Sequence, residues 1–321
     1  MNLLANLTRS ALRAGCALSL TVLAACGGGD RVERFAPQRL LAFGDETSVV
    51  DDSASPANGR KYSVNALKAD NVTLDCSASA IWIQYLTATF GFALPQCNPN
   101  TVADPKSRIY AANGATVAEL GAQIDTHLLS DTFGGTDLVT VLVGAHDVLA
   151  QYALYDGSNE AALTATLQAD GIEIAGQVNR IAKIGGKVIV VTVPDMGLTP
   201  FAIAEESASP GRAALLSRLT AALNVKLRAN LINDGRMIGL VLADEVVQTA
   251  VKFPSLYALS NATGAVCDST KAATLLDCTT LTLVTDGNAG SWLWADATHL
   301  SPAGHKFIGQ LAQTRAVNNP F

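Results

Sequence analysis

The chain has 321 residues, of which 49% are hydrophobic and 16% are charged, a composition too apolar for an intrinsically disordered protein. Its 22 lysines and arginines against 28 aspartates and glutamates leave a formal net charge of −6, without a cluster of basic residues. Because contacts with nucleic-acid phosphates need grouped lysine and arginine side chains, this balance argues against nucleic acid as a partner.

The N-terminal segment has the layout of a secretory signal. Arg9 and Arg13 precede an apolar run over residues 14–25, which is too short to span a bilayer because that requires about 20 residues. Small residues end the run directly before Cys26, and three glycines follow. This arrangement resembles the lipobox of bacterial lipoproteins, which implies cleavage before Cys26 and acylation of its thiol. A plain signal peptide with a chance cysteine is the alternative.

The lipobox resemblance implies three segments and a location. Residues 1–25 form the signal peptide, residues 26–38 the lipidated cysteine with a flexible tether, and residues 39–321 the folded domain. The lipid would anchor the domain to a membrane of the cell envelope. Glycine at position 27 favours the outer membrane, with the domain facing the periplasm or the cell surface.

Four further cysteines suit an oxidising compartment outside the cytoplasm. They allow three pairings, of which we favour the sequence-local pairs Cys76–Cys97 and Cys267–Cys278. A zinc site is the rival interpretation. It has little support because the cysteines form no C-x-x-C pair and no histidine lies at metal-ligand spacing from them, so we expect no metal or other cofactor.

Buried strands alternate with helices along the rest of the chain. Short apolar runs predict strands at 39–43, 138–143, 187–193 and 238–242, and the first three of these runs are followed by glycine or proline. Apolar residues at helical spacing predict helices at 81–90, 116–129, 160–184, 211–232, 244–252 and 302–315, the third weakened by Gly171 and Gly176. Residues 50–75 read as a polar loop, and residues 261–291 as irregular. Fully apolar strands separated by helices predict one α/β domain with a parallel sheet covered on both faces.

Several polar segments follow strand ends, where parallel sheets bind ligands. Four segments stand out, namely Phe43-Gly44-Asp45-Glu46, residues 110–116, residues 143–147 and residues 296–302. Taken together, they resemble the motifs of the SGNH or GDSL family of esterases and lipases, particularly its secreted bacterial branch. The resemblance covers about residues 39–315. It implies a flavodoxin-like three-layer α/β/α sandwich with a central parallel sheet, the SGNH hydrolase fold.

The family resemblance also implies a reaction, the hydrolysis of carboxylic esters. A serine attacks the ester carbonyl, a histidine takes its proton, an aspartate orients the histidine, and fixed N–H groups hold the oxyanion. On this pattern Asp296 and His299 are the aspartate and the histidine, and Gly114 belongs to the oxyanion hole. His146 stands there where the family has asparagine. The ligand would be an ester, a lipid or an acylated carbohydrate.

The departure from the family lies at the nucleophile, because position 46 carries glutamate instead of serine. A carboxylate has no proton for His299 to remove, and its attack on an ester would give a high-energy mixed anhydride. Glu46 and Asp296 on two sides of His299 should raise the pKa of the imidazole and hold it protonated. Ser48 is the less favoured substitute nucleophile, since a helix would rotate it about 200° from position 46.

Three functions follow from these residues. The first is an exported ester hydrolase of lipase, esterase or polysaccharide-deacetylase type, with an altered active site. The second is a non-catalytic envelope lipoprotein that binds an acylated or carbohydrate ligand in the retained cleft. The third, in which Glu46 serves as a general acid or base with Asp45 or Asp296 as partner carboxylate, has no other support in the sequence.

Overall fold

The computed structural model describes residues 34–53 and 59–318. The expected signal peptide and Cys26 lie outside these residues. The folded unit begins at Phe35, whose ring packs edge-on against Phe90. Within the described ranges, no helix is both long and apolar enough to cross a membrane.

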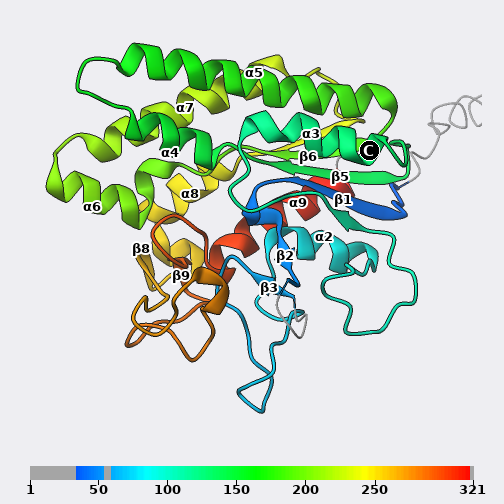
Figure 1. Cartoon of the computed structure of the whole chain (residues 1–321), viewed down its shortest axis with the longest axis horizontal. Helices are drawn as coiled ribbons and strands as arrows, with labels where there is room; N and C mark the ends of the chain where they lie inside the picture. The colour runs from blue at the N-terminus through cyan, green and yellow to red at the C-terminus, as the bar shows by residue number, and fades with distance from the viewer. Residues whose placement is uncertain (1–33, 54–58, 319–321) are drawn as a thin grey trace, which may run out of the picture. The chain divides into compact units, whose positions relative to one another are not determined.

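A five-stranded parallel sheet forms the centre of the domain (Figure 1). Its strands are β1 (Arg39–Gly44), β4 (Arg108–Ile109), β5 (Asp137–Leu142), β6 (Lys187–Val191) and β7 (Ile238–Val241). They lie in the order β4-β1-β5-β6-β7. Chain order therefore reverses between β1 and β5, as in the flavodoxin-like arrangement, and such a reversal opens a crevice at the carboxyl ends of the two strands.

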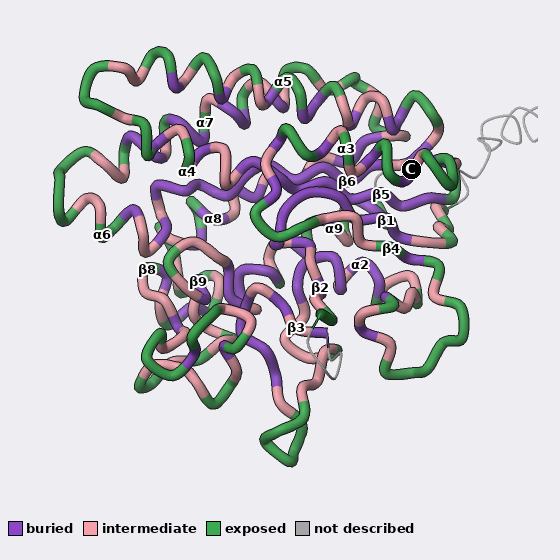
Figure 2. The backbone as a smooth tube through the Cα atoms, in the orientation of Figure 1, coloured by how far each residue is buried: buried purple, intermediate pink, exposed green. Residues whose placement is uncertain are grey.

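Helices cover both faces of this sheet (Figure 1). One face carries α3 (Val117–Leu128), α4 (Ala145–Ala153), α5 (Glu160–Ile184) and α7 (Arg212–Asn230), and the other carries α2 (Trp82–Phe90), α8 (Ala243–Lys252) and α9 (Pro302–Asn318). Alternate residues of β1 enter the two cores: Leu41 and Phe43 face the first set of helices, Leu40 and Ala42 the second. Apart from the half-buried Arg39 and Lys187 at their starts, β1, β5 and β6 are accordingly buried (Figure 2). The predicted three-layer α/β/α fold is confirmed.

The remaining elements are short. They are η1 (Glu46–Ser48), β2 (Val50–Asp51), β3 (Arg60–Lys61), η2 (Met196–Leu198), α6 (Pro200–Ala208), η3 (Pro254–Tyr257), β8 (Asn261–Ala265), η4 (Leu275–Asp277) and β9 (Trp292–Trp294).

Every long strand and helix expected from the sequence is present, but α4, α6 and β4 were not predicted. The start of α6 had a local signal, because the Thr199 hydroxyl caps the helix and Pro200 occupies its first position. By contrast, β4 is a two-residue edge strand. It exists because Leu41 and Ala42 pair with it, and it has no pattern of its own.

The two glycines inside α5 differ in role. A Cβ at Gly171 would lie 2.2 Å from the carbonyl oxygen of Leu223 on α7, so glycine lets the two helices approach closely. A Cβ at Gly176 would meet nothing within 4 Å. Helix packing therefore requires glycine at position 171 but not at position 176, although both glycines lower the helix propensity of α5.

Two disulfides join Cys76 to Cys97 and Cys267 to Cys278, the sequence-local pairing that was favoured. Cys278 is fully buried in a small separate core with Val64 and Val266. The second disulfide therefore closes a loop within the segment after β8, and the burial of Cys278 beside Val64 packs that loop against the domain.

Candidate functional site

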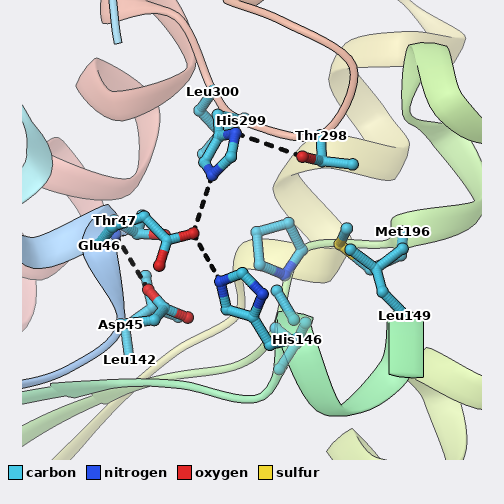
Figure 3. Close-up of a pocket in the computed structure, with 13 residues that line it drawn as sticks. Asp45, Glu46, Thr47, Leu142, His146, Leu149, Met196, Thr298, His299 and Leu300 are labelled. Carbon is cyan, nitrogen blue, oxygen red and sulfur yellow. Dashed lines mark hydrogen bonds and ion pairs between the residues drawn. The ribbon is translucent and has the colours of Figure 1, made fainter. Parts of the chain in front are cut away.

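The candidate site lies at the carboxyl ends of β1 and β5, where the strand order reverses (Figure 3). Three elements far apart in the sequence supply its central side chains: Glu46 opens η1 directly after β1, His146 lies in the first turn of α4, and His299 precedes α9. Figure 3 shows the two imidazoles converging on the Glu46 carboxylate.

The turn that carries Glu46 is held rigidly. Gly44 has a φ of 122°, and a Cβ there would lie 1.8 Å from the carbonyl oxygen of Leu142, so only glycine fits. The side-chain amide of Gln123 on α3 forms two hydrogen bonds with the Gly44 backbone. Its oxygen accepts the Gly44 N–H at 2.7 Å, and its nitrogen donates to the Gly44 carbonyl at 2.9 Å. Asp45 then caps η1 by accepting the Thr47 N–H. These contacts fix the position from which the Glu46 side chain projects.

The Glu46 carboxylate accepts three hydrogen bonds. Its Oε1 lies 2.8 Å from Nε2 of His299 and 2.7 Å from Nε2 of His146. Its Oε2 accepts the backbone N–H of Gly114 at 2.9 Å. A single buried side chain thus contacts the imidazole beside it and both groups that the family resemblance assigns to the oxyanion hole.

Asp296 completes the arrangement on the far side of His299. Both carboxylate oxygens lie 2.9 Å from Nδ1 of the imidazole, and Oδ1 also accepts the His299 backbone N–H at 2.8 Å. Asp296 therefore fixes the ring orientation and directs Nε2 at Glu46. The order of groups is carboxylate, imidazole, carboxylate, with a second imidazole closing the site.

The carboxylates and imidazoles of this cluster shift one another's pKa values toward the charged forms. Burial by itself lowers the pKa of His299, but hydrogen bonds to Asp296 and Glu46 outweigh burial and raise the pKa to about 10. The hydrogen bond to Glu46 also raises the pKa of His146, against a smaller opposing effect of burial. For Glu46, burial favours the protonated acid, but the contacts with His146 and His299 dominate and lower the pKa. At neutral pH the Glu46 carboxylate is therefore paired with the imidazolium of His299, and its contact with His146 favours the protonated form of that ring as well.

Asp45 behaves differently from its neighbour. Complete burial and the nearby charge of Glu46 raise the pKa of Asp45 to about 7. Its carboxyl group therefore changes protonation near neutral pH while Glu46 stays ionised. The two adjacent acids have opposite shifts because only Glu46 contacts the imidazoles.

Ser48 lies away from this cluster. Its hydroxyl is fully buried and accepts a hydrogen bond from Nε1 of Trp82 at 3.1 Å, on the side of η1 that packs against α2. A hydroxyl in this position cannot reach Nε2 of His299, which Glu46 contacts instead. The structure thus brings Glu46, Gly114, His146, Asp296 and His299 together and leaves Ser48 apart.

Two positioning residues were not identified from the sequence. Gln123 is one, because nothing local distinguishes it from other polar residues on the surface of a helix. Asp147 is the other: its carboxylate accepts the N–H of Val117 at 3.1 and 3.2 Å and so ties α4 to the start of α3, next to the Gly114 loop. Its place in the segment 143–147, which resembles a family motif, was a usable signal.

The open space beside the cluster is small. A cavity of about 30 Å³ adjoins Glu46 and the two histidines, with Leu149, Val193 and Met196 forming much of its apolar side. This volume holds about two water molecules. Among the residues that the structure describes, no group of three or more His, Cys, Asp or Glu side chains is arranged to hold a metal ion.

The sequence is similar to that of one known protein family. The sequence model described as GDSL-like lipase/acylhydrolase matches residues 40–312, a range that contains the whole cluster. No curated protein matches the sequence.

Three solved structures illustrate the similarity. A lipolytic protein of the G-D-S-L family from Veillonella parvula is 10% identical, with a TM-score of 0.42, and the match covers 86% of this chain and 96% of that one. An acetylxylan esterase from Geobacillus stearothermophilus is 15% identical, with a TM-score of 0.42 and coverage of 88% and 96%. An α/β hydrolase from the metagenome of Lake Arreo, Spain, is 17% identical, with a TM-score of 0.43 and coverage of 88% and 96%.

Proposed function

The chain belongs to the GDSL-like lipase/acylhydrolase family, and from this premise we propose that it is an exported lipoprotein whose ester-hydrolase site has been silenced by Glu46. One observation carries the proposal. The Glu46 carboxylate contacts His299, His146 and the Gly114 N–H at the same time. It therefore occupies the nucleophile position and the oxyanion hole together.

The first reason for inactivity is the proton balance. Ester hydrolysis by this machinery needs a histidine that accepts a proton from a hydroxyl. His299 is already protonated at neutral pH, because its pKa is raised to about 10, and Glu46 has no proton to give. The imidazole at this position is a cation paired with two carboxylates rather than a base.

The second reason is the leaving group. If the Glu46 carboxylate attacked an ester, the tetrahedral intermediate would have to expel either an alkoxide or the carboxylate. The carboxylate is by far the weaker base and leaves first, so the ester is regenerated. A general-base role for Glu46 is disfavoured for a related reason, because its lowered pKa makes it a poor acceptor of protons.

The third reason is access. A substrate carbonyl oxygen would need the Gly114 N–H and His146, and Glu46 already accepts hydrogen bonds from both. The adjoining cavity of about 30 Å³ has no room for an acyl chain or a sugar ring. The alternative in which the cleft binds an acylated or carbohydrate ligand gains no support from this volume.

The decisive experiment compares the native protein with two variants. The variants are Glu46→Ser and Glu46→Ser combined with His299→Ala. Each purified protein is incubated with p-nitrophenyl acetate and p-nitrophenyl butyrate. We expect background rates from the native protein, and a rate at least about a hundredfold higher from Glu46→Ser. The double variant should return to background. The Asp296–His299 pair and the Gly114 N–H are already placed to serve a hydroxyl at position 46.

Two results would overturn the proposal. Native turnover that His299→Ala abolishes would mean that the site is active as it stands. A Glu46→Ser variant that folds but stays inert would mean that Glu46 is not what silences the site. A fluorophosphonate probe adds an independent readout: it should label the serine introduced at position 46, and labelling of Ser48 in the native chain would restore the alternative nucleophile.

The lipoprotein part of the proposal rests on the sequence around Cys26 and has its own test. Cys26→Ala should release the protein from the membrane fraction of the cells that export it. Unchanged membrane association would count against lipidation at this residue without affecting the esterase experiment.

A further inference from the structure

A long groove runs beside the edge of the sheet, away from the candidate active site. Two adjoining cavities of about 270 and 440 Å³ are lined by α8, η3 and α9, and they share Val246, Tyr257 and Leu311. The smaller one also borders the edge strand β7, through Leu240. The two cavities therefore form one groove, whose volume far exceeds the cavity beside Glu46.

The walls of this groove are apolar. The ring of Tyr257 packs edge-on against Phe307, with ring centroids 4.9 Å apart. At the rim, the side chains of Leu256 and Phe253 point outward, and these residues are 77% and 46% exposed. Clusters of exposed large apolar residues on otherwise well-packed domains mark surfaces that bind an apolar partner.

Cations surround the same groove. Lys306 and Arg315 line it, and the Lys252 ammonium lies 5.3 Å from the centre of the Phe253 ring. None of these three cations forms an ion pair within the residues described here. The only acid lining the groove, Glu245, is paired with Arg228 at 2.9 Å.

The sequence around the groove is poor in acidic residues. In a chain of net charge −6, residues 246–267 and 297–321 contain no aspartate or glutamate. These stretches include η3 and α9, two of the three elements that form the groove. The groove is thus a locally positive surface on an acidic protein, and this favours an anionic ligand.

From the apolar walls and the unpaired cations together, we propose that this groove binds an anionic phospholipid at a bilayer surface. An acyl chain lies along Tyr257, Phe307 and Leu311, and the phosphate contacts Lys306. Arg315 lies about 13 Å further along α9 and attracts the surrounding anionic headgroups. Leu256 and Phe253 enter the bilayer interface, as exposed apolar residues flanked by lysine do in interfacial anchors. The proposal is independent of whether Glu46 silences the esterase site.

The test uses the full chain with Cys26→Ala, so that no acyl group on residue 26 contributes to binding. The protein is sedimented with vesicles of phosphatidylcholine alone and with vesicles that also contain phosphatidylglycerol. We expect binding to the anionic vesicles and little to the neutral ones. In the same background, Lys306→Glu combined with Arg315→Glu should weaken binding by about tenfold or more, and Leu256→Ser should also weaken it.

Matched controls separate the groove from general adsorption. Leu129 is 88% exposed at the end of α3 on the other face of the sheet, and Lys106 is an exposed lysine in a distant loop. Leu129→Ser and Lys106→Glu should bind as tightly as the parent, because neither residue lines the groove. Circular dichroism at rising temperature checks that each variant folds.

Three outcomes would overturn the assignment. They are equal binding to neutral and anionic vesicles, groove variants that bind like the controls, and no binding to vesicles by the parent. The last outcome would leave the apolar groove to a peptide or to a second copy of the chain.

Discussion

The carboxylate of Glu46 and the imidazole of His299 lie 2.8 Å apart, and the ring is held on its other side by Asp296. In a serine hydrolase a neutral hydroxyl faces this nitrogen. Here a charge faces it, so the contact that normally activates a nucleophile becomes an ion pair. The consequences for stability, titration and recovered chemistry can each be measured.

The first prediction concerns the stability that this ion pair provides. Glu46→Gln keeps the size of the side chain but removes the charge that both imidazoles contact. We expect a loss of about 2 kcal/mol in the free energy of unfolding, less than for a fully buried pair because each histidine can release its proton. Urea denaturation measures it. Glu245→Gln, which breaks an exposed pair with Arg228, should change stability by no more than about 0.5 kcal/mol. Equal effects of the two variants would contradict a structural role for Glu46.

The second prediction concerns pH. The pKa of His299 is raised from 6.5 to about 10 by folding. A raised pKa contributes stability in full below the unfolded value, and that contribution is lost as the pH rises through the folded value. The free energy of unfolding should therefore fall between about pH 7 and pH 10. Glu46→Ala should flatten this fall, because it removes one of the two carboxylates that raise the pKa.

Nuclear magnetic resonance gives a direct check of the same titration. The ring signals of His299 should shift with a midpoint near pH 10 in the native protein and at a lower pH in Glu46→Ala. A native midpoint close to 6.5 would rule out the ion pair as described.

The third prediction concerns His146 in the reactivated protein. Removal of Glu46 takes away the largest cause of the raised His146 pKa, so the ring becomes neutral more readily and its Nε2 is free to face an oxyanion. In the Glu46→Ser background, His146→Ala should lower kcat by at least about tenfold with little change in KM. His146→Asn, which restores the residue of the family motif, should keep kcat. If both variants behave alike, His146 does not donate to the oxyanion.

The fourth prediction uses the two glycines of α5. Gly171→Ala places a methyl group against the Leu223 carbonyl of α7 and should destabilise the protein by about 1 to 3 kcal/mol. Gly176→Ala meets open space in the same helix and should stabilise it by about 0.5 to 1 kcal/mol. Thermal unfolding should therefore show a lower midpoint temperature for Gly171→Ala and a higher one for Gly176→Ala than for the native protein. If Gly171→Ala also stabilised the protein, the two helices would have to separate easily at this position.

Much of the fold was predictable because its signals are local. The apolar runs of β1, β5 and β6 and the helical spacing within α3 each lie within a few turns of chain, and they require a parallel sheet between two layers of helices. Residues such as Gln123 were missed for the opposite reason. Its amide acts as a positioning group only because it forms hydrogen bonds with the Gly44 backbone, which lies 79 residues away in the chain.

The sequence by itself determined that position 46 carries glutamate directly after Gly44-Asp45 and that Asp296 and His299 lie three residues apart, since these are facts of residue identity and spacing. Only the tertiary structure decided that the Glu46 side chain meets His146 and Gly114 as well as His299, and that the Ser48 hydroxyl bonds to Trp82 instead. The direction of a side chain depends on the packing of elements distant in sequence, and local periodicity carries no record of that packing.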